Sequence, residues 1–206
     1  MLKIWGRISS INVKKVVWAA QELGLPFERA DIGGAFGLTK TPEALARNPN
    51  ALIPVIDDDG FILWESNVIV RYLCKKHAPG SLYPADLVTL FSAERWMDWQ
   101  QTTFNPASRN AFWHLIRLPE TERSADLIQK SINATEPLLD VLELLLSRNA
   151  FVAGGQFTMA DIPLACEVHR WSGLPIAQAA RPHIARWYAQ MQARPASRGV
   201  LDLALS

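Results

Sequence analysis

The chain is poor in cysteine, carries almost no net charge and contains no long apolar run. Its two cysteines, Cys74 and Cys166, form no Cys-x-x-Cys motif, which argues against a disulfide framework and against a dithiol redox centre. A net charge of +1 gives no electrostatic reason to expect nucleic acid or a membrane as the main partner. No stretch is long enough to span a bilayer, and the first residues lack the apolar stretch of a signal peptide. We therefore expect a cytoplasmic protein.

Residues that commonly bind metals are too scattered to predict a metal site. Cys166 and His169 have the spacing of a ligand pair on a helix, but no second pair completes the set. The acidic run at residues 57–59 lacks the further ligands of a calcium loop and is typical of a solvated turn. We expect no metal.

The first part of the chain alternates between strand and helix patterns. A short apolar run at Leu2–Trp5 predicts a strand, apolar residues at helical spacing over 13–20 predict a helix, and residues 25–31 can form a second strand. A right-handed crossover would make these two strands parallel. A short helix is expected within 39–47. Together with the segment that follows, the predicted order is β-α-β-α-β-β-α.

Residues 48–73 predict a strand, a tight turn, a second strand and a helix. The turn signal is Asp59-Gly60, which lies between apolar runs at 51–56 and 61–64. Pro54 interrupts the first run and suits only an edge or a bulge of a sheet, because it cannot donate a ladder hydrogen bond.

Glu65 and Ser66 stand where the last of these strands leads into the helix. A hydroxyl and free backbone N–H groups at the positive end of a helix suit a carboxylate, and Glu65 could hold an ammonium group beside it. A peptide paired with the open edge at Ile53 would then present the two charges of an α-amino acid end to these residues. The alternative is that Ser66 only caps the helix.

The pattern changes after residues 78–86, which contain two prolines and a glycine and lack helical periodicity. Helical stretches are expected over 87–113, broken or kinked near Pro106, and over 125–146, kinked at Pro137. Thr158-x-x-Asp161 has the form that opens a helix, with the acid reaching back to the threonine. We therefore expect one domain over 1–80, a linker over 81–86 and an all-helical domain over 87–206.

Four segments carry a family resemblance in this order along the chain: SSINVKKV, NPNALIPVI, WESNVIVRYL and FVAGGQFTMADI. Together they resemble the cytosolic glutathione S-transferases, in particular bacterial serine-type members similar to the theta and phi classes. The resemblance covers nearly the whole chain. It implies an α/β thioredoxin-like domain packed on an all-α domain, and a homodimer. It also implies an enzyme that conjugates glutathione, its co-substrate, to small hydrophobic electrophiles.

The resemblance implies roles for single residues of the glutathione site. Ile53-Pro54 matches the family's cis-proline loop, whose first residue pairs with the cysteinyl backbone of glutathione. Glu65 and Ser66 match the residues that hold its γ-glutamyl end, which agrees with the charge argument above.

Two further positions bear on the glycyl carboxylate of glutathione. Lys40 could meet this carboxylate, or it could be an ordinary solvated lysine. Leu52 departs from many relatives, in which a lysine or arginine makes this contact. The departure implies weaker glutathione binding or a compensating role for Lys40.

The loop that leads into the first helix carries the groups expected to stabilise the thiolate. A free thiol has a pKa near 8.5 and is mostly protonated at neutral pH. Ser10 and Asn12 can each donate a hydrogen bond to the sulfur, worth roughly 1.5–3 kcal/mol. Our order of preference is Ser10, then Asn12, then Ser9. The alternative is that Ser9 or Ser10 simply caps the first helix.

An apolar pocket between the two domains would hold the electrophile. Phe104, Arg109, Phe112 and Trp113 are candidates for its wall, and the alternative for each aromatic residue is packing in the core.

Two other functions are compatible with the same residues. One is a glutathione-dependent disulfide reductase or peroxidase that uses the same thiolate. The other is a non-catalytic module of the same fold that binds a protein or a hydrophobic ligand. The Glu65-Ser66 and Ser10-Asn12 pairs favour an enzyme, whereas Leu52 favours the module.

Overall fold

A mixed sheet of four strands forms the first part of the molecule, which a computed structural model describes from Met1 to Ser206. The strands lie in the order β2-β1-β3-β4. Their bounds are β1 (Leu2–Trp5), β2 (Phe27–Ala30), β3 (Val55–Asp58) and β4 (Phe61–Trp64). β1 and β2 are parallel, as the predicted crossover requires, whereas β3 is antiparallel to both β1 and β4.

The hairpin between β3 and β4 turns at Asp59-Gly60, as predicted. These two residues have φ values of 52° and 94°, and the commonest two-residue hairpin turn needs positive φ at both central positions. The preceding strand is shorter than the predicted run over 51–56, because β3 begins only at Val55. Pro54 has no N–H to give to the ladder, so strand pairing begins directly after it.

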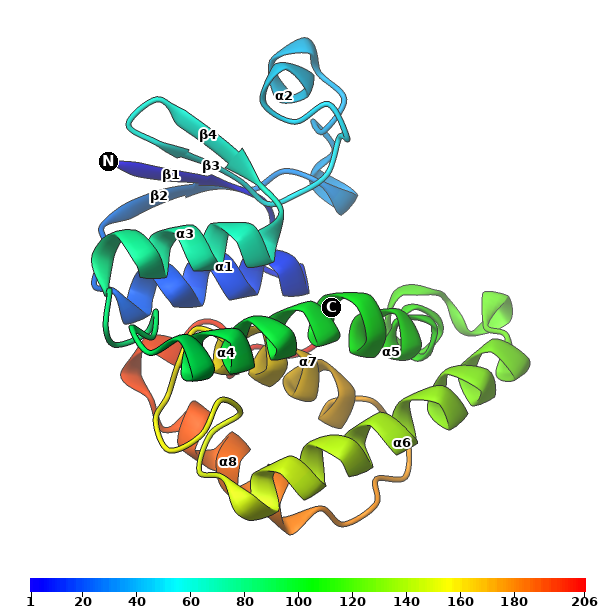
Figure 1. Ribbon diagram of the computed structural model, residues 1–206. Coiled ribbons are helices and arrows are strands. Elements are labelled where there is room, and N and C mark those ends of the chain that lie inside the picture. Colours follow the sequence, from blue (N-terminus) through cyan, green and yellow to red (C-terminus); the bar gives the residue numbers. More distant parts are fainter.

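Three helices accompany the sheet: α1 (Ile11–Glu22), α2 (Pro42–Arg47) and α3 (Ser66–His77). α1 and α3 pack side by side on the face of the sheet that is turned toward the rest of the molecule, whereas α2 lies away from it (Figure 1). The element order β-α-β-α-β-β-α is therefore confirmed.

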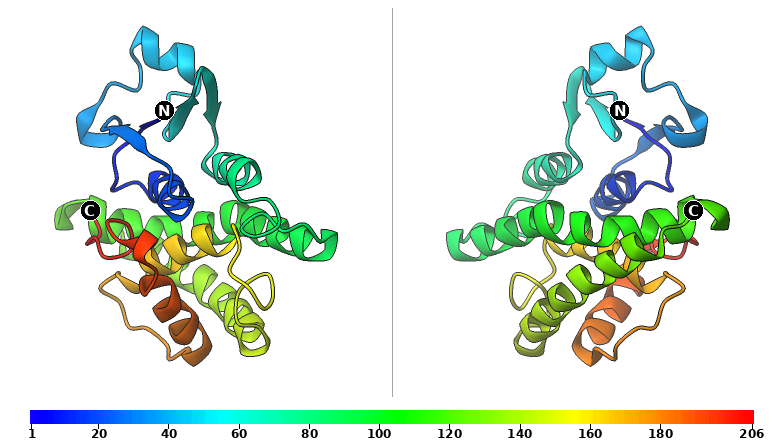
Figure 2. Two further views of the ribbon diagram at one scale, coloured as in Figure 1. Left: turned by 90° about the vertical axis from the view of Figure 1, so that its left-hand side faces the viewer. Right: turned by 90° about the vertical axis from the view of Figure 1, so that its right-hand side faces the viewer.

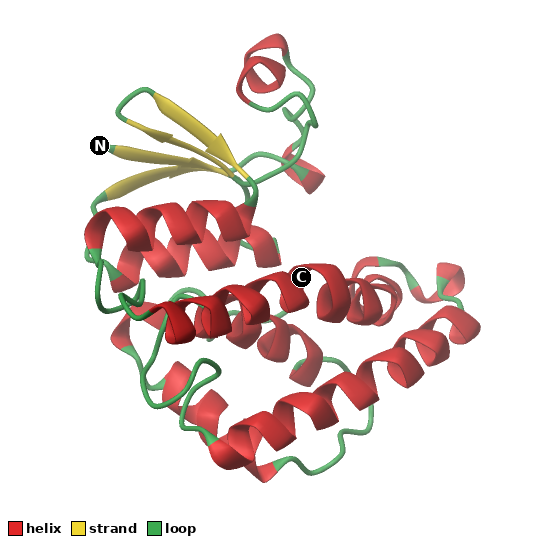
Figure 3. Cartoon of the chain, viewed as in Figure 1, coloured by secondary structure: helices red, strands yellow, loops and turns green.

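The remainder of the chain is helical, as predicted, and Figure 3 shows no strand in it. The main helices are α4 (Leu87–Trp99), α5 (Asn105–Phe112), α6 (Ala125–Arg148), α7 (Asp161–Ser172) and α8 (Pro182–Gln192). Almost all of α7 is buried, and it contacts α1 on one side and α8 on the other (Figure 2). No helix combines the length and the hydropathy that crossing a membrane would need.

The irregularity predicted near Pro106 takes the form of π-helical turns rather than a break. Residues 100–104 and 113–117 form such turns on either side of α5, and Pro106 lies in its first turn. The wider i→i+5 pattern accommodates a residue that cannot donate to the regular helical ladder. α6 likewise continues through Pro137 without interruption.

Asp161 forms the predicted reach-back contact at the start of α7. Its carboxylate accepts hydrogen bonds from the backbone N–H of Thr158 at 2.9 Å and of Val152 at 3.0 Å. It also accepts one from the indole N–H of Trp187 at 2.9 Å, which joins α7 to α8. One buried carboxylate thus satisfies three buried donors.

Candidate active site

The register of the sheet brings three distant segments to the same end of the strands. Trp5, Val55 and Trp64 are direct neighbours across β1, β3 and β4. The loop that follows Trp5, the Ile53-Pro54 peptide that precedes Val55 and the Glu65-Ser66 step that follows Trp64 therefore lie at one edge. These are the same segments in which glutathione contacts are expected from the sequence.

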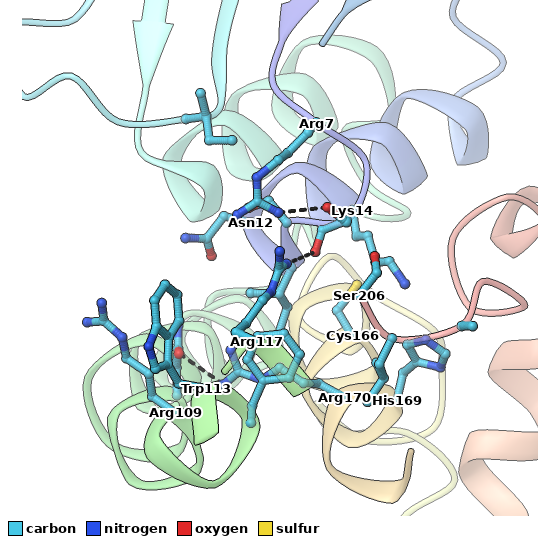
Figure 4. Close-up of a pocket in the computed structure, with 18 of the residues that line it drawn as sticks. Arg7, Asn12, Lys14, Arg109, Trp113, Arg117, Cys166, His169, Arg170 and Ser206 are labelled. Atoms are coloured by element: carbon cyan, nitrogen blue, oxygen red, sulfur yellow. Dashed lines mark hydrogen bonds between the residues drawn. The ribbon is translucent and has the colours of Figure 1, made fainter. Parts of the chain in front are cut away.

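The loop between β1 and α1 presents polar side chains to a cavity of about 370 Å³ between the two parts of the molecule (Figure 4). Ser9, Ser10 and Asn12 all line this cavity. Ser10 occupies the capping position of α1, yet its hydroxyl makes no capping hydrogen bond. Ser10 therefore stands at the cap of α1, as the alternative expected, but its hydroxyl makes no bond to the helix and remains available to a ligand.

The neighbours of Ser10 differ in how far their polar groups are already engaged. The hydroxyl of Ser9 accepts a hydrogen bond from Arg7 at 2.7 Å. The side-chain oxygen of Asn12 is buried without any hydrogen-bond partner. A buried acceptor without a partner is costly, so this oxygen would favour a ligand that donates to it, whereas a thiolate would have to be met by the N–H₂ group of Asn12.

The expected cis peptide bond is present between Ile53 and Pro54. Ile53 lines the cavity, and neither its N–H nor its C=O takes part in a backbone hydrogen bond. A Cβ atom on Gly6 would lie 3.3 Å from Ile53 and only 2.4 Å from Val13, so a glycine is needed for the loop to pass this close. A free donor and acceptor beside Ser10 suit the main chain of an extended peptide.

The helix α3 begins at Ser66, and Glu65 takes the capping position without a capping hydrogen bond. The alternative in which Ser66 caps this helix is therefore wrong. Glu65 has a φ of 73°, in the left-handed region that residues other than glycine adopt only occasionally. Ser66 is buried and Glu65 is exposed, and both lie outside the lining of the cavity, as does the buried Pro54.

The two positions assigned to the glycyl carboxylate are both exposed. Leu52 is 63% exposed and lines the cavity. Lys40 lies in the loop before α2 and is exposed, but it is not part of the cavity wall.

The wall of the second part of the molecule carries Arg109, Phe112 and Trp113, whereas Phe104 is absent from it. Phe104 is fully buried and packs against Trp99 with ring centroids 5.4 Å apart. Its assignment to the pocket is corrected because its side chain is buried against Trp99. The alternative of packing in the core therefore holds for Phe104.

Several cationic residues of the cavity were not predicted. Arg7, Lys14, Arg117 and Arg170 line it beside the predicted residues. Arg7 lies in the same loop as Ser10, so its position was visible in the sequence. Arg117 and Ser9 are 108 residues apart, and only the fold brings the Arg117 side chain within 3.2 Å of the Ser9 carbonyl.

Comparison with known proteins decides the family. Residues 9–76 match the family model described as the N-terminal domain of glutathione S-transferase, and residues 95–195 match the model of its C-terminal domain. The chain belongs to the glutathione S-transferase family.

Relatives of this glutathione S-transferase family member align over nearly its full length. It is 36% identical to glutathione S-transferase GstB of Escherichia coli strain K12, with all of both chains covered. It is 33% identical to glutathione S-transferase 3 of Zea mays, covering 95% of this chain and 90% of that one. The theta class glutathione S-transferase of Xanthomonas axonopodis pv. citri with glutathione bound superposes with a TM-score of 0.96. That structure is 38% identical, covering 100% of this chain and 99% of the other.

Neither cysteine of this glutathione S-transferase family member is a reactive thiolate. Cys166 lines the cavity, but burial raises its pKa to about 12, so it stays a protonated thiol. Burial likewise raises the pKa of Cys74 to about 12. No group of three or more His, Cys, Asp or Glu side chains lies close enough to hold a metal ion.

Proposed function

We propose that this protein conjugates the thiolate of glutathione to small electrophiles that have an apolar body. One observation carries the proposal. Two groups line the same cavity: the Ser10 hydroxyl, which makes no capping hydrogen bond, and the backbone N–H and C=O of Ile53, which make no backbone hydrogen bond. The hydroxyl suits the sulfur of glutathione as a hydrogen-bond donor, and the backbone groups suit the main chain of its cysteinyl residue.

Glutathione would lie along the sheet edge with its cysteinyl backbone paired to Ile53. Its γ-glutamyl end would reach Ser66, where the free N–H groups at the start of α3 favour a carboxylate, and Glu65 would receive the ammonium group. The glycyl end would then point toward Lys40 and Leu52. In this arrangement the sulfur faces Ser10.

The chemical step requires an ionised sulfur. Hydrogen bonds from Ser10 and Asn12, and the positive end of α1, would stabilise the thiolate over the thiol. Two such bonds supply enough free energy to lower the thiol pKa by one or two units, at about 1.36 kcal/mol per unit. An electron pair of the thiolate sulfur then forms the S–C bond. The leaving group departs with the electron pair of its bond to the same carbon.

The electrophile would lie against Phe112 and Trp113, with Arg109 at the same wall. Trp113 is 45% exposed and offers accessible apolar surface, whereas the ring of the half-buried Phe112 lies against the guanidinium groups of Arg117 and Arg170, at 5.3 Å and 5.2 Å from its centre. An apolar wall with a few convergent polar groups is typical of small-molecule sites.

A homodimer in the cytoplasm completes the proposal. Val68 on α3 and Leu87, Val88 and Phe91 on α4 are large apolar residues between 42% and 79% exposed. Such a group of exposed apolar side chains is typical of a protein interface.

Two buried, unpaired cysteines suit a reducing compartment.

Three measurements test the proposal. We expect the protein to be retained on immobilised glutathione, and Ser66→Ala to lose this retention. We expect conjugation of chlorodinitrobenzene to exceed reduction of a small disulfide, both measured as enhancement over the uncatalysed reaction. Binding without either activity would favour a module, and a dominant disulfide activity would favour the reductase.

A further inference from the structure

Cationic side chains gather around the cavity with no carboxylate side chain among its lining residues. Arg7, Lys14, Arg109, Arg117 and Arg170 line it, and no aspartate or glutamate does. Arg170 is paired with the buried carboxylate of a neighbouring glutamate, but no ion pair neutralises the other four. In a chain with a net charge of only +1, this is a marked local excess of positive charge.

Two of these cations, Arg7 and Arg117, converge on Ser9 (Figure 4). Arg7 donates to the Ser9 hydroxyl at 2.7 Å, and Arg117 donates to the Ser9 carbonyl at 3.2 Å. The Nε atom of each guanidinium is buried without a partner. Burial lowers the pKa of both side chains, and the charge of Arg7 lowers that of Arg117 further. Both side chains are only partly buried, but two like charges close together still disfavour each other unless an anion joins them.

Both arginines are held in place by their surroundings. A Cβ atom on Gly34, which has a φ of 58°, would lie 2.4 Å from the Nε of Arg7, so this glycine makes room for the side chain. The guanidinium of Arg117 stacks 5.3 Å from the ring centre of Phe112. A planar donor group fixed in this way is prepared to bind a carboxylate with little further ordering.

We infer that the electrophile taken by this site is a flat, apolar molecule that carries a carboxylate, which Arg7 and Arg117 bind together. The inference rests on the proposed transferase function and adds the charge of the substrate. Ser9 and Ser10 are adjacent, and adjacent α-carbons are about 3.8 Å apart. The arginine pair that binds Ser9 therefore stands next to the residue proposed to hold the sulfur, and Phe112 lines the same cavity.

A suitable probe is 4-chloro-3-nitrobenzoate. The glutathione thiolate attacks the carbon that bears chlorine, and its electron pair forms the S–C bond while the nitro group takes up the negative charge. Chloride then leaves with the pair of the C–Cl bond, and the proton of the original thiol passes to the buffer. The carboxylate is unchanged and serves only for binding.

The experiment compares this acid with 4-chloro-3-nitrobenzamide, which has nearly the same shape and no charge. Each kcat/KM is divided by the rate constant of the uncatalysed reaction with glutathione. We expect the acid to be favoured by about tenfold or more in the wild type, and this preference to fall by about tenfold or more in Arg117→Gln, since a charged hydrogen bond contributes about that factor. Arg148→Gln is the matched control, because Arg148 is an exposed arginine on α6 away from the cavity.

A second readout needs no variant. We expect added salt to reduce the preference of the wild type for the acid, because salt screens the attraction between charges and leaves the amide unaffected. A preference that is absent, or that is equal in the wild type and Arg117→Gln and insensitive to salt, would overturn the inference while leaving the transferase intact. If neither probe nor chlorodinitrobenzene is conjugated, the proposed function fails as well.

Discussion

The ammonium group of Lys15 donates a 2.8 Å hydrogen bond to the side-chain oxygen of Gln100, and this contact ties α1 to the helical part of the molecule. The amide of Gln100 in turn donates to Glu167 on α7 at 2.7 Å. Glu167 also accepts from Ser108 at 2.6 Å and forms an ion pair with Arg170. This buried network fixes the start of α1, and therefore Ser10, relative to the cavity wall.

We predict that Glu167→Gln lowers the free energy of unfolding by about 3–5 kcal/mol, because it leaves buried cations at Lys15 and Arg170 without their anion. Denaturation in urea measures the change. Glu120→Gln removes an exposed carboxylate that forms no ion pair, and we expect it to be nearly neutral. A loss below about 1 kcal/mol for Glu167→Gln would show that the network does not hold the two parts together.

The carboxylate of Asp161 should give stability a specific pH dependence. Burial raises its pKa in the folded protein to about 6, whereas the unfolded chain has a value near 3.9. Between these values the folded state binds more protons than the unfolded state, so this residue contributes stability that is lost as the pH rises through that window.

We expect the unfolding free energy of the wild type, relative to Asp161→Asn, to fall by up to about 3 kcal/mol between roughly pH 4 and pH 7, at about 1.36 kcal/mol per unit of pKa difference. The variant cannot titrate at this position, and other titrating groups cancel in the difference. Urea denaturation at several pH values measures it. Two stability curves that run parallel would contradict the assignment of the shift to Asp161.

The sequence predicted those features that depend on local chemistry. Asp59-Gly60 marked the hairpin and Thr158-x-x-Asp161 marked the start of α7, because turns and helix starts need particular backbone angles and hydrogen-bond partners within a few residues. The sequence predicted that Ser10 binds the sulfur, but it could not distinguish a hydroxyl bonded to the helix from a hydroxyl free for a ligand. The difference lies in which way the side chain turns.

The sequence did not predict features that depend on long-range packing. Phe104 was expected in the pocket wall, and the fold places it in the core beside Trp99. Arg117 follows no motif, and its contact with Ser9 exists only because the π-helical turn at residues 113–117 lies against the loop before α1.

Leu52 offers a test of how glutathione lies in the site. It is exposed at the cavity where a cation would meet the glycyl carboxylate. We expect Leu52→Lys to lower the KM for glutathione about two- to fivefold with little change in kcat, since an exposed ion pair contributes about 0.2–1 kcal/mol. Leu45→Lys on α2 adds the same charge outside the cavity and should have no such effect. An unchanged KM in Leu52→Lys would place the glycyl end elsewhere.

The exposed apolar surface of α4 should decide the oligomeric state. Val88 and Phe91 are 79% and 66% exposed, and Leu144 on α6 is 56% exposed. We expect the wild type to have twice the chain mass by light scattering and Val88→Glu/Phe91→Glu to have the mass of one chain, because a charge cannot be buried unpaired in an interface. Leu144→Glu should remain dimeric. A wild type with the mass of one chain would remove the dimer from the account.

The measurement that tests the central claim most directly is the pKa of glutathione bound to the enzyme, followed through the ultraviolet absorbance of its thiolate. We expect the wild type to hold this pKa at least one unit below the value of about 8.5 for a free thiol, and Ser10→Ala to bring it back toward that value. Ser9→Ala should change it less, because the Ser9 hydroxyl is already engaged with Arg7. The same lowered pKa in Ser10→Ala as in the wild type would contradict the claim that Ser10 stabilises the thiolate.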